Sequence, residues 1–148
     1  MPDNPVRHGG DALRTMAPHV AYRIRMLLSL DAYPKEMAPW VIKNAMTESS
    51  IMHLRAMHEF FTRTKSRHDD DVFATDYVPE SSLEEFLPER WAGLLDKYLP
   101  HNTIEAFRTP NPDWPLDVLI KKTTERYERF LGALSVAMRA AFGPTRAL

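Results

Sequence analysis

A single predicted helix carries most of the side chains in this chain that could perform chemistry. It spans about Pro39 to Lys65 and holds Glu48, His53 and Arg55 among apolar residues. A carboxylate and an imidazole can transfer protons, and a guanidinium can stabilise negative charge that develops on a phosphate. With one histidine from later in the chain, these residues form the candidate catalytic set: Glu48, His53, Arg55 and His101.

The spacing of these residues predicts where they lie on the helix. At about 100° per residue, His53 lies near the centre of the apolar face. Glu48, Arg55 and Glu59 form a second stripe along the flank of that face. Arg55 and Glu59 are four residues apart, so the two side chains can form an ion pair.

His53 has three interpretations that the sequence leaves open. It can be a core histidine hydrogen-bonded to one partner, which the residues favour. It can belong to a polar site with Glu48 and Arg55. It can also be a metal ligand together with His19 and His101, because helical bundles build metal sites from facing helices.

Motifs that would indicate a cofactor or a known catalytic mechanism are missing from the sequence. The chain has no cysteine, and it contains no Gly-x-Ser-x-Gly, no His-Glu-x-x-His and no glycine-rich phosphate loop. The Glu-x-x-His motif of di-iron bundles is also missing. The aspartate run at 69–71 lacks the spacing of a calcium loop and is interpreted as a solvated helix end. We therefore expect neither a metal nor another cofactor.

The composition is that of one globular domain. The chain has 148 residues, of which 44% are hydrophobic and 26% are charged. Its net charge of −1 lacks the basic excess of a typical nucleic-acid binder. The first residues hold no apolar core of a signal peptide, and no apolar run approaches the length of a membrane span. We expect a cytoplasmic protein that does not enter a membrane.

Basic residues gather in two places. Arg63, Lys65 and Arg67 follow Phe60 and Phe61 at the end of the predicted second helix. The second group lies on the polar side of the last predicted helix and consists of Lys121, Lys122, Arg126 and Arg129, interleaved with Glu125 and Glu128. Both groups could contact the phosphates of RNA, although the glutamates in the second group favour a solvated helix face.

Hydrophobic periodicity predicts an all-α fold. A first helix is expected from about Asp11 or Pro18 to Leu30, and the second from about Pro39 to Lys65. The last helix is expected from about Leu116 to Phe142, where Gly143-Pro144 stops it. Between them lies a broken third element, which starts at a capping box formed by Ser82 and Glu85.

These elements predict a single-domain four-helix bundle, mostly up-and-down, with a broken third helical element. The bundle is expected over residues 11–142, with a flexible tail at 1–10 and a short C-terminal tail at 143–148. The short connection between the first two helices makes them antiparallel neighbours.

The order of features from about Ala38 to Arg108 resembles the HEPN superfamily. The similar features are the helix NAMTESSIMHLRAMHEFF, the pair Asp70-Asp71 leading into DVFATDY, and the stretch YLPHNT that contains His101. The resemblance implies an all-α bundle that is often dimeric. Catalytic members are metal-independent ribonucleases of toxin–antitoxin and phage-defence systems, whereas inactive members bind RNA or partner proteins.

Catalytic members of that superfamily carry an arginine, four to six intervening residues and a histidine. In this chain the nearest arginine ahead of His101 is Arg90, which is too far away. We therefore expect a non-catalytic binding module of HEPN-like type that acts as a homodimer or with a protein partner. A HEPN-like ribonuclease or toxin effector is the alternative, and a histidine-ligated metal bundle is the second.

Overall fold

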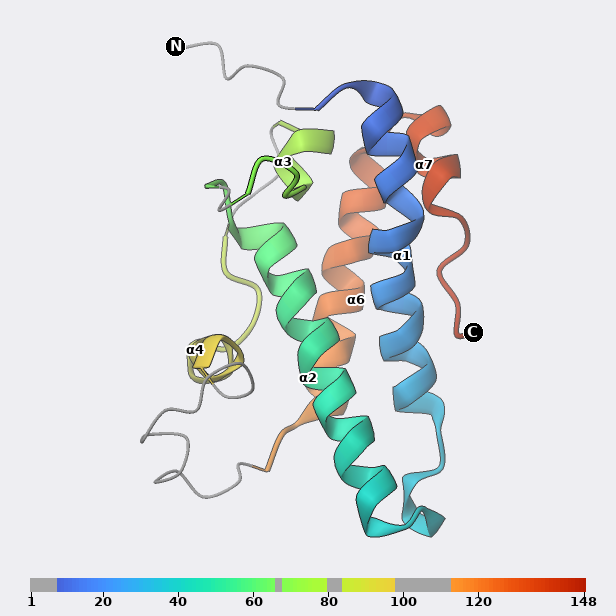
Figure 1. Ribbon diagram of the computed structural model, residues 1–148, viewed down its shortest axis with the longest axis vertical. Coiled ribbons are helices and arrows are strands. Elements are labelled where there is room, and N and C mark those ends of the chain that lie inside the picture. Colours follow the sequence, from blue (N-terminus) through green and yellow to red (C-terminus); the bar gives the residue numbers. More distant parts are fainter. Residues whose placement is uncertain (1–7, 66–67, 80–83, 98–112) are drawn as a thin grey trace.

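The computed structural model describes residues 8–65, 68–79, 84–97 and 113–148. Within these ranges every regular element is a helix, which confirms the all-α class. Three long helices lie side by side (Figure 1): α1 (Gly10–Ala32), α2 (Trp40–Thr62) and α6 (Leu116–Ala133). The shorter elements are η1 (Lys35–Met37), α3 (Ala74–Tyr77), α4 (Glu89–Lys97) and α7 (Val136–Phe142).

Helices α1 and α2 form an antiparallel hairpin, as the short connection predicts (Figure 1). Helix α1 begins at Gly10 and continues through Pro18, which is exposed to solvent. Its buried residues recur every three or four positions, so one stripe of the helix faces its neighbours. These buried residues are Leu13, Ala17, Val20, Ala21, Ile24 and Leu27.

Aromatic side chains from four helices form the core near the C-terminal end of α2. Phe130 of α6 is only 2% exposed. Its ring centroid lies 5.4 Å from that of Phe60 of α2, 5.8 Å from Tyr77 of α3 and 5.5 Å from Phe142 of α7. The Tyr77 hydroxyl also donates a hydrogen bond to the carbonyl of Leu13, at 2.9 Å. This cluster ties α3 and α7 to the long helices.

The prediction of one continuous last helix was wrong, because the chain bends between α6 and α7. Leu134 and Ser135 are extended, and the Ser135 hydroxyl accepts a hydrogen bond from the Met138 amide as an N-cap. The Arg139 guanidinium donates to the carbonyl of Leu131 at 2.9 Å, which satisfies the end of α6. The bend lets α7 pack against α1 and buries Phe142 in the aromatic cluster.

Ser135→Ala is expected to lower the free energy of unfolding by about 1 kcal/mol, because the α7 N-cap loses its side-chain acceptor. Urea unfolding measures this change. Ser135→Asp is the matched control, since its carboxylate retains an acceptor, and it should unfold at nearly the wild-type midpoint. Equal losses in both variants would show that the hydroxyl is not acting as a cap.

The second and last helices end close to their predicted limits. Helix α2 ends at Thr62. Helix α7 ends at Phe142, and its C-cap is Gly143, whose positive φ of 71° suits a residue without a side chain. The C-terminal residues then run back along α1, where the Leu148 amide donates to the Ser29 hydroxyl at 2.7 Å. The described part of the predicted broken third element is α4, and the four-helix, up-and-down arrangement stays a prediction. No helix in the described ranges is long and apolar enough to cross a membrane.

Candidate functional site

Three of the four predicted catalytic residues, Glu48, His53 and Arg55, lie among the described residues, and they meet different surroundings on α2. Glu48 is exposed on α2 and forms no ion pair with any described residue. His53 is buried at 7% exposure, and Arg55 is half-buried on the next side of the same helix. His101 lies outside the described residues. The prediction that His101 completes the candidate set therefore stays untested.

His53 lies between α2 and α1, where it meets two α1 side chains. Arg23 donates from Nη1 to His53 Nδ1 at 3.3 Å, and the Tyr22 ring packs edge-on at a centroid distance of 5.9 Å. Because an arginine can only donate, Nδ1 is the acceptor and the ring proton resides on Nε2. Burial, and then the charge of Arg23, lower the pKa of His53. The arrangement is that of a neutral histidine held by one partner.

Arg55 faces a separate, shallow groove on α2. Its Nε lies 3.1 Å from Glu59 Oε1, which confirms the predicted ion pair, and Arg63 Nη2 lies 3.2 Å from the same oxygen. The groove has a volume of about 370 Å³ and is lined by Arg23, Ile51, Met52, Arg55, Ala56, Glu59 and Leu95. His53 does not line this groove. Arg55 is thus neutralised by a carboxylate four residues away and does not converge with His53.

A second polar centre involves His58, which the sequence reasoning left out of the candidate set. His58 of α2 is buried, and its Nε2 lies 2.6 Å from Glu85 Oε2. Glu85 Oε1 also accepts hydrogen bonds from the amides of Phe86 and Leu87, each at 3.0 Å. Burial raises the pKa of the Glu85 carboxyl, but the hydrogen bonds from His58 and the two amides outweigh it, so the pKa is lowered.

The His58–Glu85 pair fastens the segment ahead of α4 onto α2. The sequence assigns Glu85 to a capping box with Ser82, which lies outside the described residues. Among the described residues, Glu85 has three hydrogen-bond partners, which are the His58 ring and the amides of Phe86 and Leu87. A buried imidazole paired with a carboxylate is a charge-assisted hydrogen bond, so this contact positions the segment firmly.

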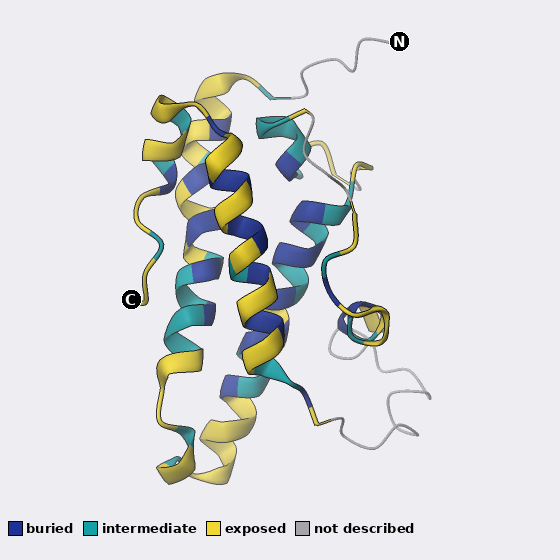
Figure 2. Cartoon of the chain, turned by 180° about the vertical axis from the view of Figure 1, so that it is seen from behind, coloured by how far each residue is buried: buried dark blue, intermediate teal, exposed yellow. Residues whose placement is uncertain are grey.

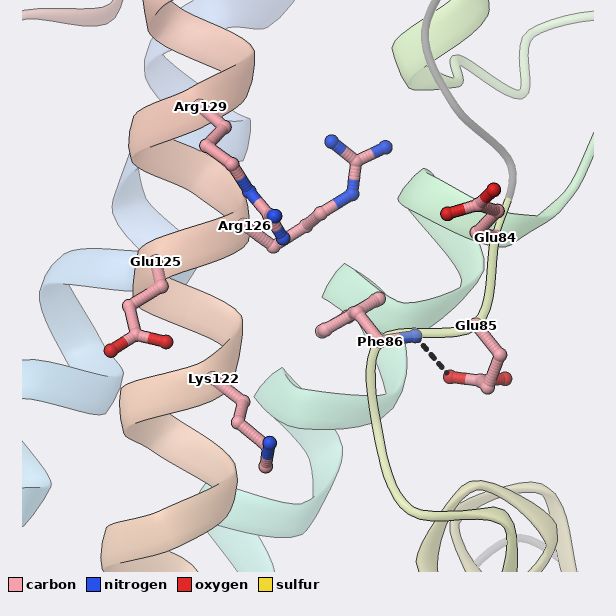
Figure 3. Close-up of a pocket in the computed structure, with 7 residues that line it drawn as sticks. All are labelled: Glu84, Glu85, Phe86, Lys122, Glu125, Arg126 and Arg129. Atoms are coloured by element: carbon pink, nitrogen blue, oxygen red, sulfur yellow. Dashed lines mark hydrogen bonds between the residues drawn. The ribbon is translucent and has the colours of Figure 1, made fainter.

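Beside this segment is a pocket of about 490 Å³ (Figure 3). One wall is α6, and the other is the segment with Glu84, Glu85 and Phe86. Arg126 crosses between them, with its guanidinium carbon 4.9 Å from the centroid of the Phe61 ring. The α6 residues that line the pocket are Lys122, Glu125, Arg126 and Arg129.

Arg126 corrects the expectation of a solvated basic face on the last helix. It is only 7% exposed, whereas its neighbours Lys122 and Arg129 are exposed. Burial lowers the pKa of Arg126, Arg129 lowers it further, and Glu84 opposes both. The side chain lies over the Phe61 ring of α2 and shares a pocket with residues 84–86, and helical periodicity cannot reveal either neighbour.

A sequence signal did exist for His58. It lies four residues after Leu54 and three before Phe61, and both of these residues are fully buried. A position at that spacing belongs to the same helix face. An apolar face of α2 wide enough to include Leu54 and Phe61 predicts that His58 is buried.

The described residues contain no group of three histidines, aspartates or glutamates that could hold a metal ion. His19 is exposed on α1, apart from the buried His53. The metal site that would also need His101 stays a prediction. No protein-family model, no curated protein and no solved structure matches this chain.

Proposed function

We propose that this protein is a non-catalytic interaction module of HEPN-like type that acts as a homodimer. The observation that supports the proposal is a cluster of exposed apolar side chains in the connection between α1 and α2 and in the first turn of α2. We call it the apolar tip, and it consists of Tyr33, Met37, Trp40, Val41 and Ile42. It lies at the end of the molecule opposite α3 and α7 (Figure 1; exposed in Figure 2).

The exposure of the tip is large for residues of these types. Met37 is 91% exposed, and Trp40 is 77% exposed. Contiguous exposed apolar residues mark interaction surfaces, and tryptophan and tyrosine are enriched among the residues that dominate binding energy. A two-fold dimer would use one such patch on each subunit, so the tip would meet its own copy.

Charges around the tip favour a second copy of the chain over a lipid surface. Lys35 and Lys43 alternate here with Asp31 and Glu36. Binding to anionic lipids favours an excess of cations, which this neighbourhood lacks. Mixed charges of both signs can instead pair across a symmetric interface. A cytoplasmic location belongs to the same proposal and is supported by the absence of cysteine from the sequence.

Sedimentation velocity over a concentration series tests the proposal. We expect a wild-type dimer and at least about tenfold weaker association for Trp40→Ser, because a central aromatic contact is typically worth more than 1.4 kcal/mol. Val136→Ser is the matched control, since Val136 is also exposed but lies on α7 at the other end. A wild-type monomer, or equal weakening by both variants, would contradict the proposal.

The pocket lined by α6 cations favours a second candidate, a HEPN-like ribonuclease or RNA-binding effector. Lys122, Arg126 and Arg129 could contact phosphates, with His101 as the proton-transferring residue. Incubation with a mixed RNA pool tests this candidate. Cleavage that persists with chelator and disappears in His101→Ala would support the ribonuclease. RNA that stays intact would instead favour the non-catalytic interaction module.

A further inference from the structure

The pocket in Figure 3 presents three cations on one side of α6. Lys122, Arg126 and Arg129 are spaced by four and three residues, so they share a helix face. Phe86 faces them from the opposite wall, where its ring packs 5.7 Å from that of Phe61. The volume of about 490 Å³ is within the range of small-molecule sites.

The carboxylates near the pocket leave part of this positive charge uncompensated. Glu85 is occupied by His58 and two backbone amides, and its carboxylate turns away from α6 (Figure 3). Glu125 points to the side of α6 away from Phe86 (Figure 3). Of the three glutamates that line the pocket, Glu84 faces the cations, on the side of Arg126.

The two outer cations lie three and four residues from Glu125 on the same helix, but no ion pair joins them to it in the described part of the chain. Neither Lys122 nor Arg129 forms an ion pair there, and both side chains are exposed at the pocket. An anion between them would gain from both charges, and arginine guanidinium groups bind phosphate oxygens in a bidentate manner. A phosphate dianion offers more charge and more acceptors to this set than a carboxylate does.

We propose that this pocket binds a phosphomonoester, with the phosphate held by Lys122, Arg126 and Arg129 and the organic part lying against Phe86. The volume leaves space for an organic group as well as the phosphate. The apolar ring of Phe86 is the surface on which that group packs. This site is distinct from the apolar tip and does not depend on dimerisation.

Isothermal titration calorimetry with phenyl phosphate, inorganic phosphate and phenol tests the site. We expect phenyl phosphate to bind more tightly than inorganic phosphate, and phenol not to bind, because the phosphate supplies the main attraction. Lys122→Gln and Arg129→Gln should each weaken phenyl phosphate binding at least about tenfold, as expected for the loss of a charged hydrogen bond. Both residues are exposed, so these variants should fold normally.

Lys121→Gln is the matched control, because Lys121 is exposed on the same helix but does not line this pocket. It removes the same charge and should change phenyl phosphate affinity less than twofold. Equal weakening by Lys121→Gln and Lys122→Gln would mean diffuse attraction to α6 and would overturn the proposal. Failure of phenyl phosphate to bind the wild type would also overturn it.

Discussion

Phe130→Ala is expected to lower the free energy of unfolding by about 3–5 kcal/mol, the typical cost of removing a buried phenyl ring. Phe130 is 2% exposed and contacts the rings of Phe60, Phe61, Tyr77 and Phe142. Its removal leaves a cavity where α2, α3, α6 and α7 meet. Chemical denaturation followed by far-ultraviolet circular dichroism measures the loss.

A matched substitution on the surface of α6 separates this core effect from helix propensity. Val118→Ala removes apolar atoms from the same helix at a position that is 43% exposed, so it should change stability by less than about 0.5 kcal/mol. Phe130→Leu should fall between the two, because leucine refills part of the space. A Phe130→Ala loss near that of Val118→Ala would refute the packing of α3 and α7 around this ring.

His58→Ala is expected to cost about 2–3 kcal/mol at pH 7, because a buried imidazole and its hydrogen bond to Glu85 are lost together. Glu85→Gln should cost less, about 0.5–1 kcal/mol, since the Glu85 side chain is 42% exposed and solvent screens its charge. In a double-mutant cycle the two losses should not add, because both variants remove the same contact.

The Glu85 contribution should depend on pH in a defined direction. The folded pKa of Glu85 is lowered below its ordinary value of 4.5, so the unfolded chain takes up this proton first as the pH falls. The stability from the pair is therefore present above pH 4.5 and is lost as the pH falls through the lower folded value. The stability difference between wild type and Glu85→Gln should shrink across that window.

Urea midpoints measured from pH 7 down to pH 3 check the pH dependence. Glu36→Gln is the control, because Glu36 is exposed in η1 and forms no ion pair with described residues, so its difference from wild type should stay near zero. A Glu85→Gln difference that stays constant across the whole range would show that the Glu85 charge does not stabilise the fold. Full additivity in the cycle with His58→Ala would lead to the same conclusion.

Much of the fold was predictable from local patterns in the sequence. The apolar stripes predicted α1, α2 and the start of α6, and Gly143 with Pro144 predicted the end of α7. The ion pair between Arg55 and Glu59 also followed from their spacing. These features depend on interactions within one or two helical turns, so the residues that decide them are close together in the sequence.

The candidate site was much less predictable. The sequence favoured Glu48, His53 and Arg55, because they share a helix and carry reactive groups. In the structure Glu48 faces solvent. His53 accepts a hydrogen bond from an arginine of α1, and Arg55 forms an ion pair with a carboxylate of α2. A shared helix fixes the angle between side chains but not the partner that each one meets.

The sequence by itself determined the helical class, the positions of the long helices and the lack of thiol chemistry. Only the tertiary structure decided that α6 and α7 separate at Ser135, that His58 pairs with Glu85, and that Arg126 lies buried beside a pocket. The reason is physical. Local spacing sets which residues share a helix face, whereas burial and ion pairing depend on which distant segment covers that face. Here residues 84–86 lie against residues of α2 and α6 that are distant from them in the sequence. Helical periodicity could not predict these contacts.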